Sequence, residues 1–137
     1  MPILVSLFEK TRFEYSYLGN NATQTVTLAR ALNVVPYYEC QLLVRWHKGT
    51  LTSGQSLIFG LYNTLPSDDD PQEFTDTGTI FTSVTLNSAS TPPALLSARA
   101  TSPQAYLKHL LTITQGSTGG TALYAEVSAC LLLRERT

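Results

Sequence analysis

YYECQLLVRWHKGTLTSGQSLIFGLYNT, residues Tyr37–Thr64, is the stretch that decides the fold. Apolar and polar residues alternate over Tyr37–His47, which predicts a strand buried on one face. The predicted buried face is Tyr38, Cys40, Leu42, Val44 and Trp46. Lys48–Gly54 is polar and contains glycine, as turns do, and a second alternating strand follows it. We therefore expect two long strands joined by a turn, a hairpin at the centre of a β-sandwich.

The remaining chain also favours strands. Further strands are predicted at Ile3–Phe8, Arg12–Leu18, Thr23–Leu28 and Thr79–Leu86, the last irregular enough to allow a bulge, and at Tyr106–Gln115 and Thr121–Arg134, which form a second long hairpin. Ala29–Val35 and Ala94–Ala100 fit either an extended segment or a helical turn, and Leu65–Gly78 is a polar loop. The predicted fold is all-β: a single domain over residues 1–137, an antiparallel two-sheet sandwich, jelly-roll-like, with about eight strands.

Composition narrows the classes of function. The formal net charge is −1 and no basic stripe is present, which argues against a nucleic-acid partner. The start, MPILVSLFEK, lacks a positive n-region and has only a short apolar run, so we expect neither a signal peptide nor a membrane span. Charged residues make up 14%, against a usual share of about 25%. Two interpretations stay open: a small stable β domain, or a surface covered by other subunits, where charges are depleted.

No metal site or disulfide framework is predicted. Cys40 and Cys130 are too few for a framework, and we expect two buried free thiols. Asp68–Asp70, with Glu73 and Asp76, form an acidic cluster whose spacing does not match an EF-hand. We expect a solvated loop with turn chemistry there, with a structural calcium as the alternative.

No catalytic motif or cofactor motif is predicted either. His47 and His109 each lie beside a cation and lack neighbours that would tune a general base. The nucleophile elbow G-x-S-x-G is absent from the sequence, so we expect a protein that is not an enzyme and binds no cofactor. Trp46 with Tyr37, Tyr38, Tyr62 and Tyr124 could form a flat platform for sugar rings. The alternative function is therefore a carbohydrate-binding β-sandwich module, although Trp46 and Tyr38 fit the core face better.

In YYECQLLVRWH and ALYAEVSACLLLR the chain resembles the small jelly-roll or β-sandwich proteins of virus particles, notably the decoration (cement) proteins of tailed phages. The resemblance is one of general character and covers most of the chain. It implies a structural protein of the virion, made in the host cytoplasm, without catalytic residues. It also implies a homo-oligomer, commonly a trimer, that lies on the major capsid protein.

Several residues on the nominally outer faces are apolar, or lie among apolar residues, which favours contact with another chain. The predicted interface comprises Tyr37, Leu43, Arg45, His47, Ile58, Tyr62 and Leu132.

Overall fold

A computed structural model describes residues 2–15, 22–52, 54–66, 74–103, 106–115 and 123–135. These residues form strands and connections without a helix. The strands are β1 (Ile3–Tyr15), β2 (Thr23–Asn33), β3 (Tyr37–Thr50), β4 (Ser56–Pro66), β5 (Phe74–Asn87), β6 (Ala94–Thr101), β7 (Tyr106–Thr114) and β8 (Leu123–Glu135).

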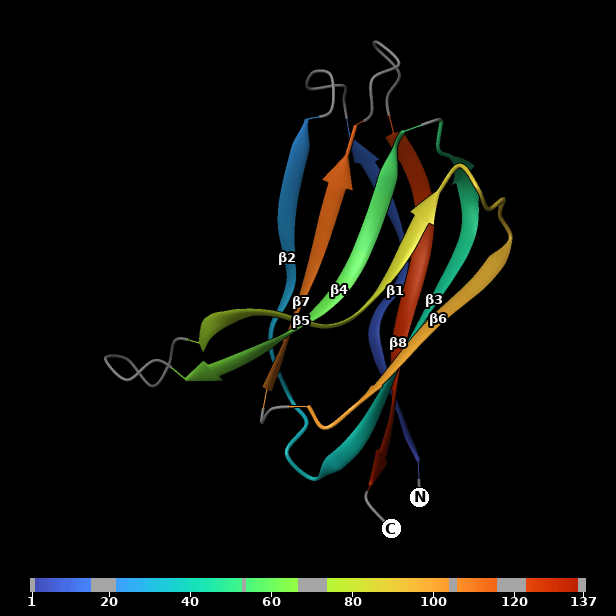
Figure 1. Cartoon of the computed structure of the whole chain (residues 1–137). Helices are drawn as coiled ribbons and strands as arrows, with labels where there is room; N and C mark the ends of the chain where they lie inside the picture. The colour runs from blue at the N-terminus through green and yellow to red at the C-terminus, as the bar shows by residue number, and fades with distance from the viewer. Residues whose placement is uncertain are drawn as a thin grey trace.

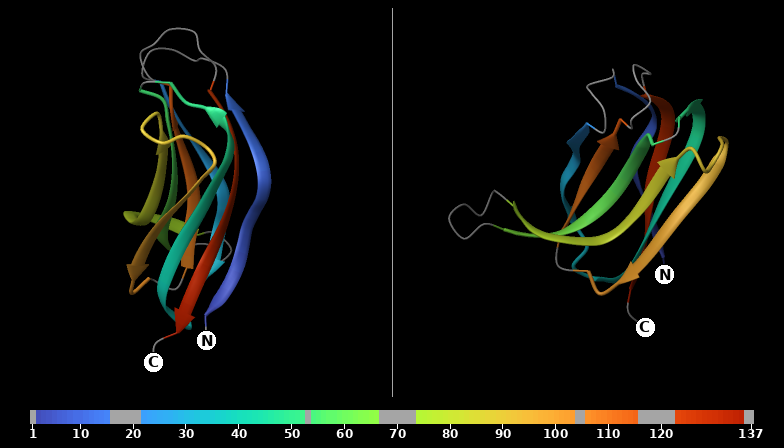
Figure 2. Two further views of the ribbon diagram at one scale, coloured as in Figure 1. Left: turned by 90° about the vertical axis from the view of Figure 1, so that its right-hand side faces the viewer. Right: turned by 45° about the horizontal axis from the view of Figure 1, so that its top comes forward.

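The strands form two four-stranded antiparallel sheets that pack face to face (Figures 1 and 2). Sheet I has the order β1-β8-β3-β6, and sheet II has the order β2-β7-β4-β5. Of the strands consecutive in sequence, β4 and β5 pair with each other, whereas the other connections cross from one sheet to the other. This arrangement is a jelly roll, which confirms the predicted fold class.

The two predicted hairpins are wrong. β3 pairs with β6 and β8, whereas β4 pairs with β5 and β7, so the two halves of Tyr37–Thr64 lie in different sheets. The same holds for β7 and β8. The connection after β3 crosses the end of the core, which is why Leu51 and Gln55 within it are buried. The tip of a hairpin would instead expose such residues to solvent.

Bulges account for the irregular strands. Ile3–Phe8 and Arg12–Leu18, predicted as separate strands, form one strand as far as Tyr15, because two register shifts on β1 absorb the break in alternation. A register shift also interrupts the pairing of β4 and β5, which confirms the bulge allowed for Thr79–Leu86.

The two segments left open are extended. Ala29–Val35 continues β2 as far as Asn33, and Ala94–Ala100 is β6. The polar loop predicted at Leu65–Gly78 is shorter than expected, because β4 and β5 extend into it from both ends.

The core lies between the sheets and follows the predicted alternation. On β3 the inward residues include Trp46, which is 1% exposed and donates a hydrogen bond from Nε1 to the carbonyl oxygen of Lys48 at 3.0 Å. Tyr38, predicted for the same face, is 37% exposed because it lies at the start of the strand, beyond the core. On β8 the predicted inward face is buried as expected: Leu123, Ala125, Val127, Ala129, Leu131 and Leu133. Full burial of each leucine contributes about 2 kcal/mol.

An aromatic cluster joins the two sheets. Phe8 and Phe13 come from β1, whereas Phe59 and His109 come from β4 and β7. The rings of Phe8 and His109 stack at 6.0 Å between centroids and an interplanar angle of 17°. The His109 side chain is buried, and its Nε2 has no hydrogen-bond partner among the described residues. Burial lowers the pKa of His109 from 6.5 to about 4, so the imidazole is neutral near pH 7.

Candidate interaction surface

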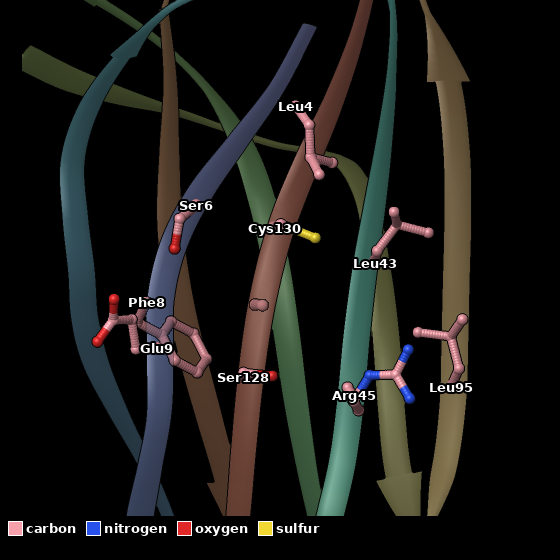
Figure 3. A pocket seen from close by; sticks show the side chains of 10 residues that line it. Leu4, Ser6, Phe8, Glu9, Leu43, Arg45, Leu95, Ser128 and Cys130 are labelled. Atoms are coloured by element: carbon pink, nitrogen blue, oxygen red, sulfur yellow. The ribbon is translucent and has the colours of Figure 1, made fainter.

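A groove of about 390 Å³ crosses the outer face of sheet I (Figure 3). We call it the β8 groove, because β8 forms its floor between β1 and β3. It is lined by Leu4, Ser6, Phe8, Glu9, Leu43, Arg45, Leu95, Ser128, Ala129 and Cys130.

Strand register assembles the groove from distant parts of the chain. One row across the sheet runs from Ser6 through Cys130 to Leu43. The next row runs from Ser128 through Arg45 to Leu95. Because successive residues of a strand point to opposite faces, these side chains point outward while their chain neighbours fill the core.

The rim of the groove is apolar where solvent would be expected. Leu4 on β1 is 63% exposed and Leu95 on β6 is 57% exposed. β1 and β6 are the two edge strands of sheet I. Exposed apolar side chains gathered over a hollow are typical of surfaces that another molecule covers.

One end of the outer face of sheet I carries charges that are paired within the chain. There Glu39 forms ion pairs with Arg99 and with Arg134.

At the other end of the outer face of sheet I, Glu126 accepts a hydrogen bond from Tyr124 Oη at 3.2 Å. Its carboxylate also lies 3.7 Å from Lys10 Nζ. The Arg12 guanidinium lies 3.9 Å from the centroid of the Tyr124 ring and also pairs with Glu14. An apolar centre between polar ends is the usual anatomy of a protein interface.

Two of the residues that line the groove are charged, one acidic and one basic. Glu9 and Arg45 are exposed, and within the described residues neither side chain forms an ion pair. They lie on opposite sides of β8, with Glu9 on β1 and Arg45 on β3 (Figure 3). The groove therefore has one acidic side and one basic side.

The structure brings together part of the predicted interface. Leu43 and Arg45 line the groove. The His47 ring contacts Ser128, a lining residue, with 2.8 Å between Nε2 and Oγ. Leu132 lies on the same outer face, in register with Leu4 of β1.

The other predicted interface residues lie elsewhere. Ile58 and Tyr62 are on β4, so they belong to the outer face of sheet II, on the opposite side of the molecule. Tyr37 packs partly against the core at the start of β3. Leu4, Glu9 and Leu95 were missed, because the sequence does not say which strands end up at the edges of sheet I. The placement of Ile58 and Tyr62 follows from the crossing connection after β3.

The pair of His47 and Ser128 lacks the other parts of a nucleophilic site. Within the described residues no carboxylate contacts the His47 ring, so nothing orients the imidazole as a general base. β8 is hydrogen-bonded to strands on both sides, which commits the amides near Ser128 to the sheet rather than to an oxyanion hole. The pair is a polar contact at the edge of the groove.

The two cysteines are free thiols on opposite faces of sheet I. Cys40 is buried in the core, and burial, followed by the nearby Glu39 carboxylate, raises its pKa to about 11. Cys130 is partly exposed in the groove, so the prediction that both thiols are buried is wrong for this residue. Its position on β8 alternates with the core residues Ala129 and Leu131, which turns its thiol outward.

The described residues lend no support to the calcium-binding and sugar-binding alternatives. They contain no group of three side chains suited to hold a metal ion, and the acidic segment Asp68–Asp70 lies outside them. They also contain no helix long and apolar enough to cross a membrane. Trp46 is buried, so it cannot stack on a sugar ring, and Tyr38 and Tyr62 lie in different sheets. A sugar-binding platform that includes Trp46, the alternative to its place in the core, is therefore not formed.

Comparison with known proteins relates the chain to others by fold alone. No protein-family model and no curated protein matches the sequence. The structure is similar to VP2 of infectious bursal disease virus in its subviral particle, with a TM-score of 0.57 and 14% identity over 98% of this chain and 33% of that one. It is also similar to the T13 particle of the same virus, with a TM-score of 0.54 and 11% identity over 98% of this chain and 31% of that one.

The chain spans about a third of the length of those viral structures. A cellobiose-bound module of Clostridium stercorarium, CsCBM6-3, is 12% identical over 93% of this chain and 82% of that one, but its TM-score is only 0.37. A score that low carries no inference. The comparisons thus show that the chain shares its fold with part of the protein in those viral particles.

Proposed function

We propose that the chain is a non-enzymatic structural protein of a virus particle, which works by covering surface on neighbouring chains. The observation that carries the proposal is the β8 groove, an apolar hollow bordered by exposed leucines on the outer face of sheet I. An isolated domain would leave this surface in contact with water, whereas a partner would bury it at a gain of about 25 cal/mol per Å² of apolar area. The viral jelly-roll fold supports the same conclusion.

In its finer form the protein decorates and stabilises a shell built by a separate major capsid protein. It is made in the host cytoplasm and resides in the virion, assembled there as a homo-oligomer, with three copies as the expected number. The proposal involves no nucleic acid, membrane or cofactor. The resemblance to tailed-phage decoration proteins in YYECQLLVRWH and ALYAEVSACLLLR supports this form.

Sedimentation with preformed shells of the major capsid protein tests the proposal. Wild-type chain should co-sediment with the shells at a fixed ratio to the capsid protein, measured by quantitative mass spectrometry. Leu43→Glu, which places a charge in the groove, should reduce that binding at least tenfold. Thr85→Glu is the matched control, because Thr85 is exposed on sheet II. Wild-type chain that stays in the supernatant with every shell, and is absent from purified virions, would refute the proposed role.

A further inference from the structure

The two open edges of sheet I carry different and complementary features. At the β1 edge, Ile3, Leu4 and Val5 are consecutive exposed apolar residues. At the other side, Leu95 and Arg45 form the wall of the groove. Edge strands with exposed apolar side chains invite pairing with another chain, so natural proteins usually protect them. Here neither protection by proline nor an inward-pointing charge interrupts Ile3–Val5.

The two charged residues of the groove also lie on opposite sides of sheet I. Glu9 lies on the β1 side and Arg45 on the β3 side, and neither forms an ion pair within the described residues. The other charges noted above on this face are paired inside the chain. An acid and a base that stay unpaired within one copy can pair between two copies.

We propose that copies of this chain associate head to tail through sheet I. The β1 edge of one copy, Ile3–Val5, packs against the β8 groove of the next, and Glu9 lies against the neighbour's Arg45. The occupant of the groove is thus a second copy of the chain. The inference rests on the proposed function in one respect: it names the contact by which copies assemble on the particle.

Shape favours a head-to-tail contact over a face-to-face one. Two copies related by a twofold axis through the groove would place one hollow against another and leave Ile3 and Val5, which are exposed but do not line the groove, uncovered. When the β1 edge of one copy enters the hollow of the next, the same contact fills the groove and buries the exposed residues of the edge. Such contacts are heterologous, and they close into a ring when successive rotations return to the first copy. The ring that agrees with the proposed function has three members.

Charge reversal at the two sites tests the contact directly. Glu9→Arg and Arg45→Glu should each weaken self-association at least tenfold, measured by native mass spectrometry over a concentration series, because like charges then face each other. The double variant, with both changes in every copy, restores opposite charges and should recover the wild-type ring. Lys108→Glu is the matched control, since Lys108 lies on β7 of sheet II, and it should associate as wild type does. Circular dichroism checks that each variant is folded.

A mixture of the Glu9→Arg and Arg45→Glu variants distinguishes a head-to-tail ring from a face-to-face dimer. The two variants carry opposite charges at both sites, so they attract each other but not themselves. In a three-membered ring they cannot alternate, so one repulsive contact remains and the closed trimer should stay at least tenfold below the wild-type level. A face-to-face dimer would instead be fully restored as a one-to-one complex, and that result would overturn the head-to-tail contact.

Two further outcomes also contradict the inference. One is a wild-type chain that stays monomeric at every concentration, and the other is a folded double variant that does not recover association. Neither depends on the virion. A monomer that still binds capsid shells would refute the head-to-tail contact but not the proposed binding to the shell. A ring that binds no shell would refute the proposed binding but not the head-to-tail contact.

Discussion

His109 should make the fold sensitive to acid. Its side chain is buried between the sheets, stacked on Phe8 and tilted against Phe59, and Nε2 has no hydrogen-bond partner. Protonation would leave a cation in this aromatic cluster without a counter-charge or a bond to stabilise it. That cost is why burial lowers the pKa of His109 from 6.5 to about 4.

The direction of the pH dependence follows from the depressed pKa. As pH falls through about 6.5, the unfolded chain takes up a proton on this residue, whereas the folded protein takes it up only near pH 4. The contribution of neutral His109 is therefore complete above pH 6.5 and is lost as pH falls toward 4. Each pH unit well inside this interval costs about 1.4 kcal/mol. Acidification from pH 7 to 5 should lower the free energy of unfolding by about 2 kcal/mol through this residue.

Urea denaturation of wild type and His109→Phe at pH 7, 6 and 5 measures the effect. Phenylalanine keeps an aromatic ring beside Phe8 and Phe59 but does not titrate. The two proteins differ at residue 109 alone, so the difference between the two pH profiles isolates the contribution of His109. The unfolding free energy of the variant should fall by about 2 kcal/mol less than that of wild type between pH 7 and 5. Parallel profiles would show that the folded protein accepts the proton without penalty and would refute the reasoning.

Three other perturbations have defined outcomes. Leu42→Ala, in the core, should lower the free energy of unfolding by about 2–5 kcal/mol, whereas Leu95→Ala at the exposed rim should change it by less than about 0.5 kcal/mol. Equal losses in denaturant titration would contradict the assigned burial. Gly49→Ala should lower the free energy of unfolding by more than about 1 kcal/mol, because the φ of Gly49 is +125° and a Cβ would lie 2.3 Å from a carbonyl oxygen of β8. An unchanged melting temperature would contradict this geometry. In folded protein diluted until copies no longer associate, a maleimide should modify Cys130 and spare Cys40, which is buried and has a pKa raised to about 11. Peptide mass spectrometry that found Cys40 modified before Cys130 would contradict this assignment.

The sequence predicts individual strands better than it predicts their partners. Alternation with a period of two identifies β3 and β8 along most of their length, because their inward residues fill a core and their neighbours do not. The same period occurs in a hairpin and in two strands that cross between sheets. What separates the two cases is the connection, where Leu51 and Gln55 are buried. That burial depends on the opposite sheet, which local sequence does not describe.

The interaction surface was predictable to the same limited degree. Leu43, Arg45 and Leu132 were identified because they lie on the outer side of clearly alternating strands. Leu4 and Leu95 were not, because their exposure arises from the order β1-β8-β3-β6, which places their strands at the edges. Ile58 was grouped with Leu43 on the assumption of a hairpin, and the crossing connection places it on the opposite side of the molecule.

The distribution of exposed apolar side chains over the jelly roll is the reason why we assign assembly to sheet I. Both sheets direct one face inward, so only outer faces and edges remain for other chains. Of the seven large apolar residues exposed in the described part of the chain, four lie on the edge strands of sheet I: Ile3, Leu4, Val5 and Leu95. The groove between those edges also holds Glu9 and Arg45, an acid and a base that form no ion pair within the described residues. Neighbouring residues of β3 thus have different surroundings, since Leu42 packs in the core while Leu43 and Arg45 line the outer groove, where we propose the contact with the next copy.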